Sequence, residues 1–436
     1  MRVALLISLT ALLLAGPAFA DEDEKPLADD PRGLVLDAWR PGRVELDVGQ
    51  GVVGRYNKDW LEDIRSKGID IFGWWMNAFQ TNPVGGIEQG YTYTGLLDFG
   101  VELDLERMLD WEDWLFHVSG SWAGGKNLSD DVGSFVPVNA VYSGDSLRFF
   151  EIWAEKRWSE DEWSLRFGRL AVGWEYGLDY DINTQYLSAA FRLNIFGLDA
   201  NAVNFTVIPF ANWGARLRWT PNSSWRIQAS VMNGYPRDFE NDDEHGLDWS
   251  FEPDKGTFII AETSYQWSAT SSQRKNKPGS LPGRVVFGGY YDTGTFDTLD
   301  ASGNTAQDLY SVYANVRQKV WEPETYGDQG IDVWTVVTYS GRQEIAPVTW
   351  FWSGGAVWAG PLHGRPDDTI ALGFANSWFS NDLPGKSYET TFELAYTYEV
   401  NDQLNVTPDI QYLLQPGGTG DIDNALILGV LLYVTF

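Results

Sequence analysis

Histidine, the side chain most often used as a catalytic base, is rare in this 436-residue chain. Its three histidines are His117, His245 and His363, and none stands beside a serine in a hydrolase motif. The chain has no cysteine, no HExxH zinc motif and no P-loop, and GGKNLS at 124–129 lacks the strand–loop–helix context of a phosphate site. We therefore expect no enzymatic activity, no catalytic residue, no cofactor and no metal site.

Charged side chains instead occupy every second position of segments whose other positions are apolar or aromatic. Asp98 and Glu102 alternate with apolar residues in 91–105, and Glu389 and Glu393 do so in YETTFELAYTYEV. A period of two is typical of β-strands with one apolar and one polar face. The polar chemistry of the chain is therefore expected on one face of a sheet.

Sixteen segments show this pattern or are bounded like strands. They lie near 69–80, 91–105, 114–123, 146–158, 163–171, 211–220, 225–234, 257–268, 282–293, 308–321, 330–341, 347–359, 368–379, 387–400, 404–414 and 425–436. Tight turns such as SEDE, PNSS and VND alternate with the long connections 124–145, 172–210, 235–256 and 294–307. Short turns on one side and long loops on the other predict an all-β fold, a transmembrane antiparallel β-barrel of 16 strands over 69–436. The alternative is a secreted soluble β-sandwich that binds glycans through its aromatic residues.

Both ends of the chain fit this interpretation. Residues 1–20 have a positive start, an apolar run and a small-x-small site, which predicts a signal peptide cleaved after Ala20. Residues 21–68 would form a short N-terminal periplasmic arm, in which 57–68 is either a helix or irregular. The terminal LILGVLLYVTF is too short for a transmembrane helix but long enough for a barrel strand that ends on Phe436.

Charge excludes one class of partner. The formal net charge is −30, whereas a nucleic-acid partner requires a basic surface. Beyond the first 20 residues no apolar run reaches 18 residues, which excludes a helical membrane protein. The acidic segment 238–254 is interpreted as a solvated loop, with divalent-cation binding as the alternative.

Four segments carry a resemblance to a known family. They are DWLEDIRSKGI, NPVGGIEQGYTYTGLLDFGVELDLERMLDW, GAVWAGPLHGRPDDTIALGF and LNVTPDIQYLLQPGG. Together they resemble carbohydrate-selective porins of the OprB type from about residue 57 to the end of the chain. The resemblance implies a 16-stranded porin of the bacterial outer membrane, passive diffusion of sugars, and a constriction formed by inward-folded loops. A non-selective general diffusion porin is the alternative within the same fold.

If sugars are the solute, two kinds of side chain should bind them. Carboxylates and guanidinium groups can hydrogen-bond vicinal hydroxyls with two contacts, and aromatic rings can cover the apolar face of a sugar. The connection 172–210, our expected constriction loop, carries both kinds in VGWEYGLDYD. The expected substrate-binding residues are Glu151, Trp153, Arg166, Arg169, Trp174, Glu175 and Tyr176. Each loop aromatic could instead pack the loop against the barrel wall.

The polar face of the strands would line the pore. The expected pore-lining residues are Asp98, Glu102, Glu155, Arg216, Arg218, Arg226, Arg317, Glu389 and Glu393. Their order along the chain predicts an acidic wall opposite a basic wall, unless the charges pair with one another or merely hydrate the lumen. The expected partners are sugars, outer-membrane lipid and lipopolysaccharide, and the outer-membrane assembly machinery, which would bind Phe436. A homotrimer is also considered, and the sequence does not decide between monomer and trimer.

Overall fold

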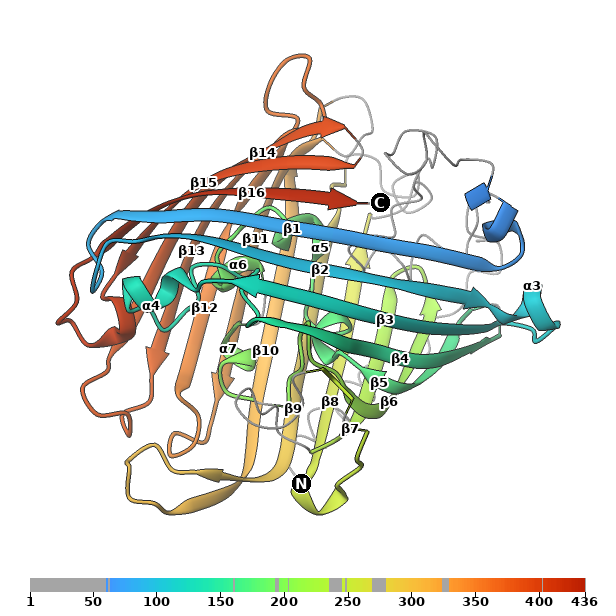
Figure 1. Ribbon diagram of the computed structural model, residues 1–436, viewed down its shortest axis with the longest axis horizontal. Coiled ribbons are helices and arrows are strands. Elements are labelled where there is room, and N and C mark those ends of the chain that lie inside the picture. The colour runs from blue at the N-terminus through green and yellow to red at the C-terminus, as the bar shows by residue number, and fades with distance from the viewer. Residues whose placement is uncertain are drawn as a thin grey trace.

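The computed structural model describes residues 60–435 except 62, 160, 193–195, 203, 235–244, 248, 269–279, 324–328 and 402. Within this part of the chain sixteen strands form one closed antiparallel barrel, in which each strand pairs with its neighbours in sequence and β16 pairs with β1 (Figure 1). The predicted 16-stranded barrel is confirmed. A β-sandwich is excluded, because the sheet closes on itself.

The strands follow the predicted segments closely. They are β1 Ile69–Val84, β2 Tyr91–Asp104, β3 Trp114–Gly125, β4 Ser146–Trp158, β5 Trp163–Leu170, β6 Asn212–Asn222, β7 Trp225–Asn233, β8 Thr257–Trp267, β9 Gly283–Asp297, β10 Thr305–Trp321, β11 Gly330–Ser340, β12 Val348–Ala359, β13 Thr369–Phe379, β14 Tyr388–Asn401, β15 Leu404–Leu414 and β16 Ala425–Thr435. Short helices lie in the connections: α3 Leu105–Leu109, α4 Leu128–Val132, α5 Tyr180–Asn183, α6 Ala189–Arg192 and α7 Phe196–Asp199, with the 3₁₀ turns η1 Val172–Trp174, η2 Pro253–Lys255 and η3 Pro416–Gly418. No helix of the described residues is long and apolar enough to cross a membrane.

Two predicted boundaries are wrong for local reasons. The connection expected at 294–307 is shorter, because β9 continues to Asp297 and β10 already begins at Thr305. Leu105 begins α3 instead of ending a strand, because the Asp104 side chain accepts hydrogen bonds from the backbone N–H groups of Glu106 and Arg107, both at 3.1 Å. An aspartate at this position satisfies donors that a helix start would otherwise leave unpaired.

The ends of the chain lie mostly outside the described residues. These include the signal peptide, most of the arm with Asn57, and the terminal Phe436. Residues 60, 61 and 63–66 are helical. The first described strand pairs with the last along a seam that runs from Trp74 opposite Thr435 to Val84 opposite Leu426, with one register shift between Thr81 and Val84.

The alternating pattern separates an apolar outer face from a polar inner face. In β16 the side chain of Leu428 is 40% exposed, whereas those of Ile427 and Leu431 on the other face are buried. Exposed tryptophans, including Trp350 and Trp352, stand on the outer face of β12. An outer face of this composition suits lipid, and closure of the sheet pairs the backbone groups that lipid could not satisfy.

The long connection between β5 and β6 folds into the barrel, where η1, α5, α6 and α7 lie (Figure 1). Leu198 and Phe205 of this connection pack with Phe258 of β8 and other inward side chains. Phe191 and Phe196 pack in a second cluster with Phe351 of β12 and further inner-wall residues. The interior is therefore filled in part by the described residues of 172–210, and many inward polar side chains are buried beneath them.

Candidate functional site

The centre of the site is a row of charges on three adjacent strands. Glu155 of β4 is paired in register with Arg166 of β5, which is paired in register with Arg216 of β6. Because residues opposite each other on one face of a sheet are close neighbours, the three side chains meet on the inner wall. Arg166 Nε lies 2.6 Å and Arg216 Nη2 3.1 Å from Glu155 Oε2. Arg157 Nε adds a third contact, at 3.2 Å from Glu155 Oε1.

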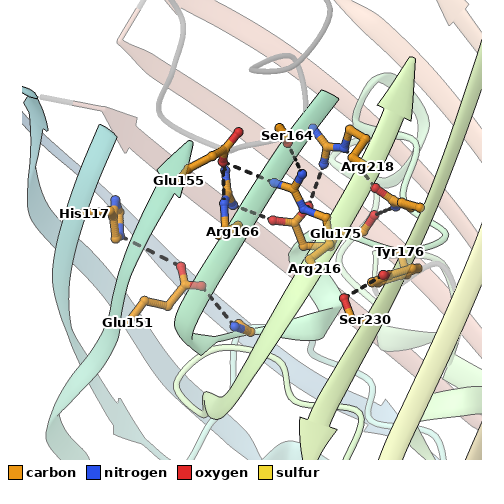
Figure 2. Close-up of polar contacts among 12 residues, drawn as sticks. His117, Glu151, Glu155, Ser164, Arg166, Glu175, Tyr176, Arg216, Arg218 and Ser230 are labelled. Carbon is orange, nitrogen blue, oxygen red and sulfur yellow. Dashed lines mark hydrogen bonds and ion pairs between the residues drawn. The ribbon is translucent and has the colours of Figure 1, made fainter. Parts of the chain in front are cut away.

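The inward connection contributes a second carboxylate, that of Glu175. Glu175 follows η1 and inserts between the arginines of two strands (Figure 2). It accepts a hydrogen bond from Arg218 Nη2 at 2.6 Å and another from Arg166, and it lies 3.5 Å from Arg216 Nε. All four side chains are buried. Buried charges of this kind require close partners, so the cluster fixes the loop to the wall.

Neutral and acidic side chains on β7 and β8 extend the cluster. Gln228 accepts from Arg218 Nε at 3.0 Å and donates to the backbone carbonyl of Glu175. Glu262 accepts from the Gly177 backbone N–H at 2.5 Å and from the Tyr313 hydroxyl at 2.7 Å. Sequence reasoning missed Gln228 because it carries no charge. Its position two residues after Arg226 on the polar face of a strand is the signal that could have identified it.

Aromatic rings stack beside the arginine row. The rings of His117 and Trp153 are nearly parallel, with centroids 4.6 Å apart, and the Arg166 guanidinium lies 3.8 Å from the centroid of the Trp153 ring. An atom of His117 lies 3.9 Å from Glu151 (Figure 2). His117 Nδ1 also lies 3.1 Å from Glu102 Oε1. This stack joins the acidic side chains of β2 and β4 to the basic row.

The three remaining candidates of the substrate set, Trp174, Tyr176 and Arg169, make their contacts outside this cluster. Trp174 is partly exposed and makes an edge contact with Trp74 of β1, at 6.4 Å between centroids. Tyr176 is fully buried, and its hydroxyl is 2.6 Å from Ser230 Oγ. Burial raises the pKa of Tyr176, so the phenol stays neutral. Arg169 donates to the backbone carbonyl of Gly246 at 2.6 Å. The structure thus brings Trp153, Arg166 and Glu175 together, with Glu151 close by.

The predicted pore-lining residues all lie on the inner face, but they do not form two separate walls. Glu155, assigned to the acidic wall, lies among the arginines. Arg317 of β10 is paired with Asp179 at 2.8 Å, Asp181 at 2.7 Å and Asp332 at 2.9 Å. The remaining members of the set on the inner face are Asp98, Glu102, Arg226, Glu389 and Glu393, and all are buried. Basic and acidic groups therefore interleave on the β4–β10 side.

The described part of the chain has no group of three or more His, Asp or Glu side chains that could hold a metal ion. Of the acidic segment 238–254, only 245–247 and 249–254 lie within the described residues. The site is thus built from paired charges, hydroxyl and amide groups and aromatic rings. Such groups bind neutral polar molecules without chemical change.

A closed 16-stranded barrel with an apolar outer belt and a long loop folded against a charged inner wall defines a porin of the bacterial outer membrane. A family model for "Carbohydrate-selective porin, OprB family" matches residues 88–436. The chain belongs to this family. It is accordingly a channel for passive, selective diffusion of sugars and not an enzyme.

Related proteins agree with this placement. Porin B of Pseudomonas aeruginosa is 25% identical over 424 residues, which cover 87% of this chain and 90% of that protein. The high-pH structure of Pseudomonas putida OprB matches with a TM-score of 0.77 and 21% identity, over 86% of this chain and 96% of that one. The low-pH structure of the same protein gives 0.57 and 18% identity, over 86% and 95%. At these identities the solved structures support the fold alone.

Proposed function

We propose that sugars are selected where residues 172–210 meet the arginine row, and that this connection is the constriction loop. The observation that carries the proposal is Glu175, which comes from the loop yet is paired with Arg166 and Arg218 of the wall. Charged groups held in place can exchange or share their hydrogen bonds with vicinal hydroxyls, two contacts at a time. The partly exposed Trp174 supplies an aromatic face for the apolar side of a sugar, whereas the buried Trp153 ring is stacked with His117 and Arg166 and supports the row.

The seven candidate residues then divide into two roles. Arg166, Glu175 and Trp174 are proposed to contact the sugar, with Trp153 and Glu151 beside them. Arg169 and Tyr176 are proposed to hold the loops, because their polar atoms are bonded to Gly246 and Ser230.

Sugar titration of ion conductance in planar bilayers tests the proposal. Sugars should reduce the conductance of the native channel, and Trp174→Ala should weaken this block by roughly two- to tenfold, the range expected for one aromatic contact. Trp350→Ala is the matched control, because Trp350 is on the outer face. Equal block in both variants would refute the role of Trp174.

The arginine has its own test in the same assay. Arg166→Ala should weaken the block further and also change ion preference, because it removes a charge from the row. A native channel whose conductance sugars do not reduce would instead support a general diffusion porin without a sugar site.

We also propose that export removes residues 1–20 after Ala20 and that the assembly machinery recognises Phe436. The support is the layout of the first twenty residues and the alternating strand before the terminal phenylalanine. N-terminal sequencing of the membrane-inserted protein should begin at Asp21. Deletion of Phe436 should lower the yield of heat-modifiable barrel, and an unchanged yield would contradict the second part.

The remaining partners are lipid, lipopolysaccharide and further copies of the chain in a homotrimer. The exposed apolar and aromatic side chains of the outer face support contact with lipid. Native mass measurement after extraction in mild detergent would distinguish a trimer from a monomer. Delipidation in the presence of a chelator would show whether divalent cations at 238–254 retain lipopolysaccharide.

A further inference from the structure

We infer that β14 anchors two inward-folded loops at once, and that Glu389 and Glu393 on this strand are positioning residues for sugar selection. The inference rests on the proposed function, because it assigns what holds the constriction loop in place. It concerns two carboxylates that the sequence suggested as pore-lining groups. In the structure they are bonded to backbone N–H groups of loops that cover them.

Glu389 binds the connection between β3 and β4. Its side chain is 1% exposed and accepts hydrogen bonds from the backbone N–H groups of Phe135 and Val136, each at 2.8 Å. A third bond, at 2.6 Å, comes from Gly417 in the connection between β15 and β16. Three N–H donors around one buried carboxylate are strong, charge-assisted contacts. Glu389 therefore ties two connections to the same point on the wall.

Glu393 does the same for the constriction loop. It lies four residues further along β14, and because the period of a strand is two, it is on the same inner face. Its two carboxylate oxygens accept from the backbone N–H groups of Leu187 at 2.6 Å and Ser188 at 3.0 Å. Leu187 belongs to the same connection as Glu175, twelve residues further on. The loop is thus held at Glu175 on one side of the barrel and at Glu393 on another.

The two anchored loops are bonded to each other as well. The Ala140 backbone N–H donates to the Leu187 carbonyl at 2.9 Å, and the Ala189 N–H donates to the Pro137 carbonyl at 3.0 Å. Release of either loop would therefore break contacts of the other. This coupling makes β14 one anchor for both loops, and not two independent contacts.

The anchor depends on carboxylate chemistry. A glutamine at 389 has the same shape, but one of its two terminal atoms is an N–H donor and would face another donor. At least one bond to a charged acceptor is lost and the others weaken. The equilibrium of the β3–β4 connection should therefore shift toward the undocked state by roughly tenfold or more. Because Glu393 bonds to the constriction loop directly, Glu389→Gln is the cleaner test of coupling between the two loops.

The test uses Glu389→Gln in full-length protein, with Glu399→Gln as control. Glu399 is on the same strand and the same face, so the control removes the same charge at the other end of β14. Neither variant should alter heat-modifiable mobility, which reports closure of the barrel. Glu389→Gln should weaken sugar block several-fold and increase single-channel conductance, whereas Glu399→Gln should leave sugar affinity unchanged.

A second measurement reports loop docking without sugar. The chain has no cysteine, so Val136→Cys and Leu187→Cys each provide a single thiol at a buried position. A membrane-impermeant thiol reagent should label both slowly in the native background and faster in Glu389→Gln. Faster labelling at 187 is the diagnostic result, because Glu389 does not bond to that loop directly and can act there only through the coupling.

The outcomes distinguish failure of the anchor inference from failure of the proposed function. If sugars block the native channel but block the Glu389→Gln channel equally, with equal labelling, the anchor inference is wrong. Labelling that rises at 136 alone would overturn joint anchoring. If sugars do not block the native channel, the proposed function fails, while the labelling experiment still tests the anchor.

Discussion

Removal of the Glu175 carboxylate by Glu175→Gln should change both ion preference and loop stability. Four guanidinium groups and two carboxylates make up the central cluster, a net charge of +2 that the substitution raises to +3. For an ion that passes about 5 Å away in water, the lost charge is worth about 0.8 kcal/mol, roughly fourfold for each ion before screening by salt. Anion permeability relative to cation permeability should therefore rise several-fold.

The same substitution should loosen the loop. Glu175 is paired with Arg166 and Arg218 in a buried setting, and loss of one partner of a buried pair costs about 3–5 kcal/mol. Reversal potentials in asymmetric KCl would measure the first effect, and the temperature of the heat-modifiable gel shift would measure the second. Asp181→Asn is the control: the same loop loses one carboxylate, but this side chain is 75% exposed. Equal reversal potentials for Glu175→Gln and native channels would refute this account of the cluster. A change in reversal potential in Asp181→Asn as large as that in Glu175→Gln would refute it too.

Three further predictions concern stability. Tyr176→Phe should destabilise the barrel by about 1–3 kcal/mol, because the buried Ser230 hydroxyl loses its 2.6 Å partner, while sugar block stays unchanged. Hydrogen bonds from Arg365 hold the pKa of Asp368 below its ordinary value. The turn between β12 and β13 therefore contributes stability above about pH 3.9, the pKa of an unfolded aspartate, and loses it as the pH falls further. Asp368→Asn should remove that acid dependence from gel-shift midpoints measured against pH. Gly429→Ala should cost about 1–3 kcal/mol, because its Cβ would come 2.1 Å from a carboxylate oxygen of β15.

Each of these predictions has a contrary outcome. Weaker sugar block in Tyr176→Phe would show that the phenol is part of the binding site. The Arg365–Asp368 pair would be shown not to contribute by either of two results. One is a native gel-shift midpoint that stays constant when the pH is lowered beneath 3.9; the other is an Asp368→Asn midpoint that decreases as much as the native one. A Gly429→Ala midpoint equal to that of the native protein would contradict the steric argument.

The fold could be predicted from the sequence because lipid imposes a simple pattern. Along each strand one face contacts lipid and the other does not, so a period of two persists over most of the chain. The pattern fails at strand ends. Asp297 and Thr305 pair at the ends of β9 and β10, where polar residues resemble a loop, and both strands are longer than predicted for that reason.

The site was predictable only in part. Arg166 and Arg216 stand on the polar face of neighbouring strands, and antiparallel pairing then makes them neighbours. The partners of Glu389 could not be predicted, because Val136 is 253 residues away and the contact depends on how a loop folds back inside the barrel. The donors there are backbone N–H groups, which every residue except proline carries and which leave no trace in a sequence.

Pairing of the first strand with the last bears on how quickly the barrel can form. Trp74 is opposite Thr435, 361 residues later by subtraction of the two numbers, whereas each of the other pairings joins strands consecutive in the chain. The entropy cost of closing the ring rises only slightly with each doubling of the chain length between the paired strands. The rate is affected more, because pairings between residues far apart in sequence form slowly. Until β16 arrives, β1 has one row of unpaired N–H and C=O groups, which lipid cannot satisfy. Substitutions that weaken β1 or β16 should therefore prolong the open, aggregation-prone stage of assembly, while leaving the mature channel's choice of solute intact.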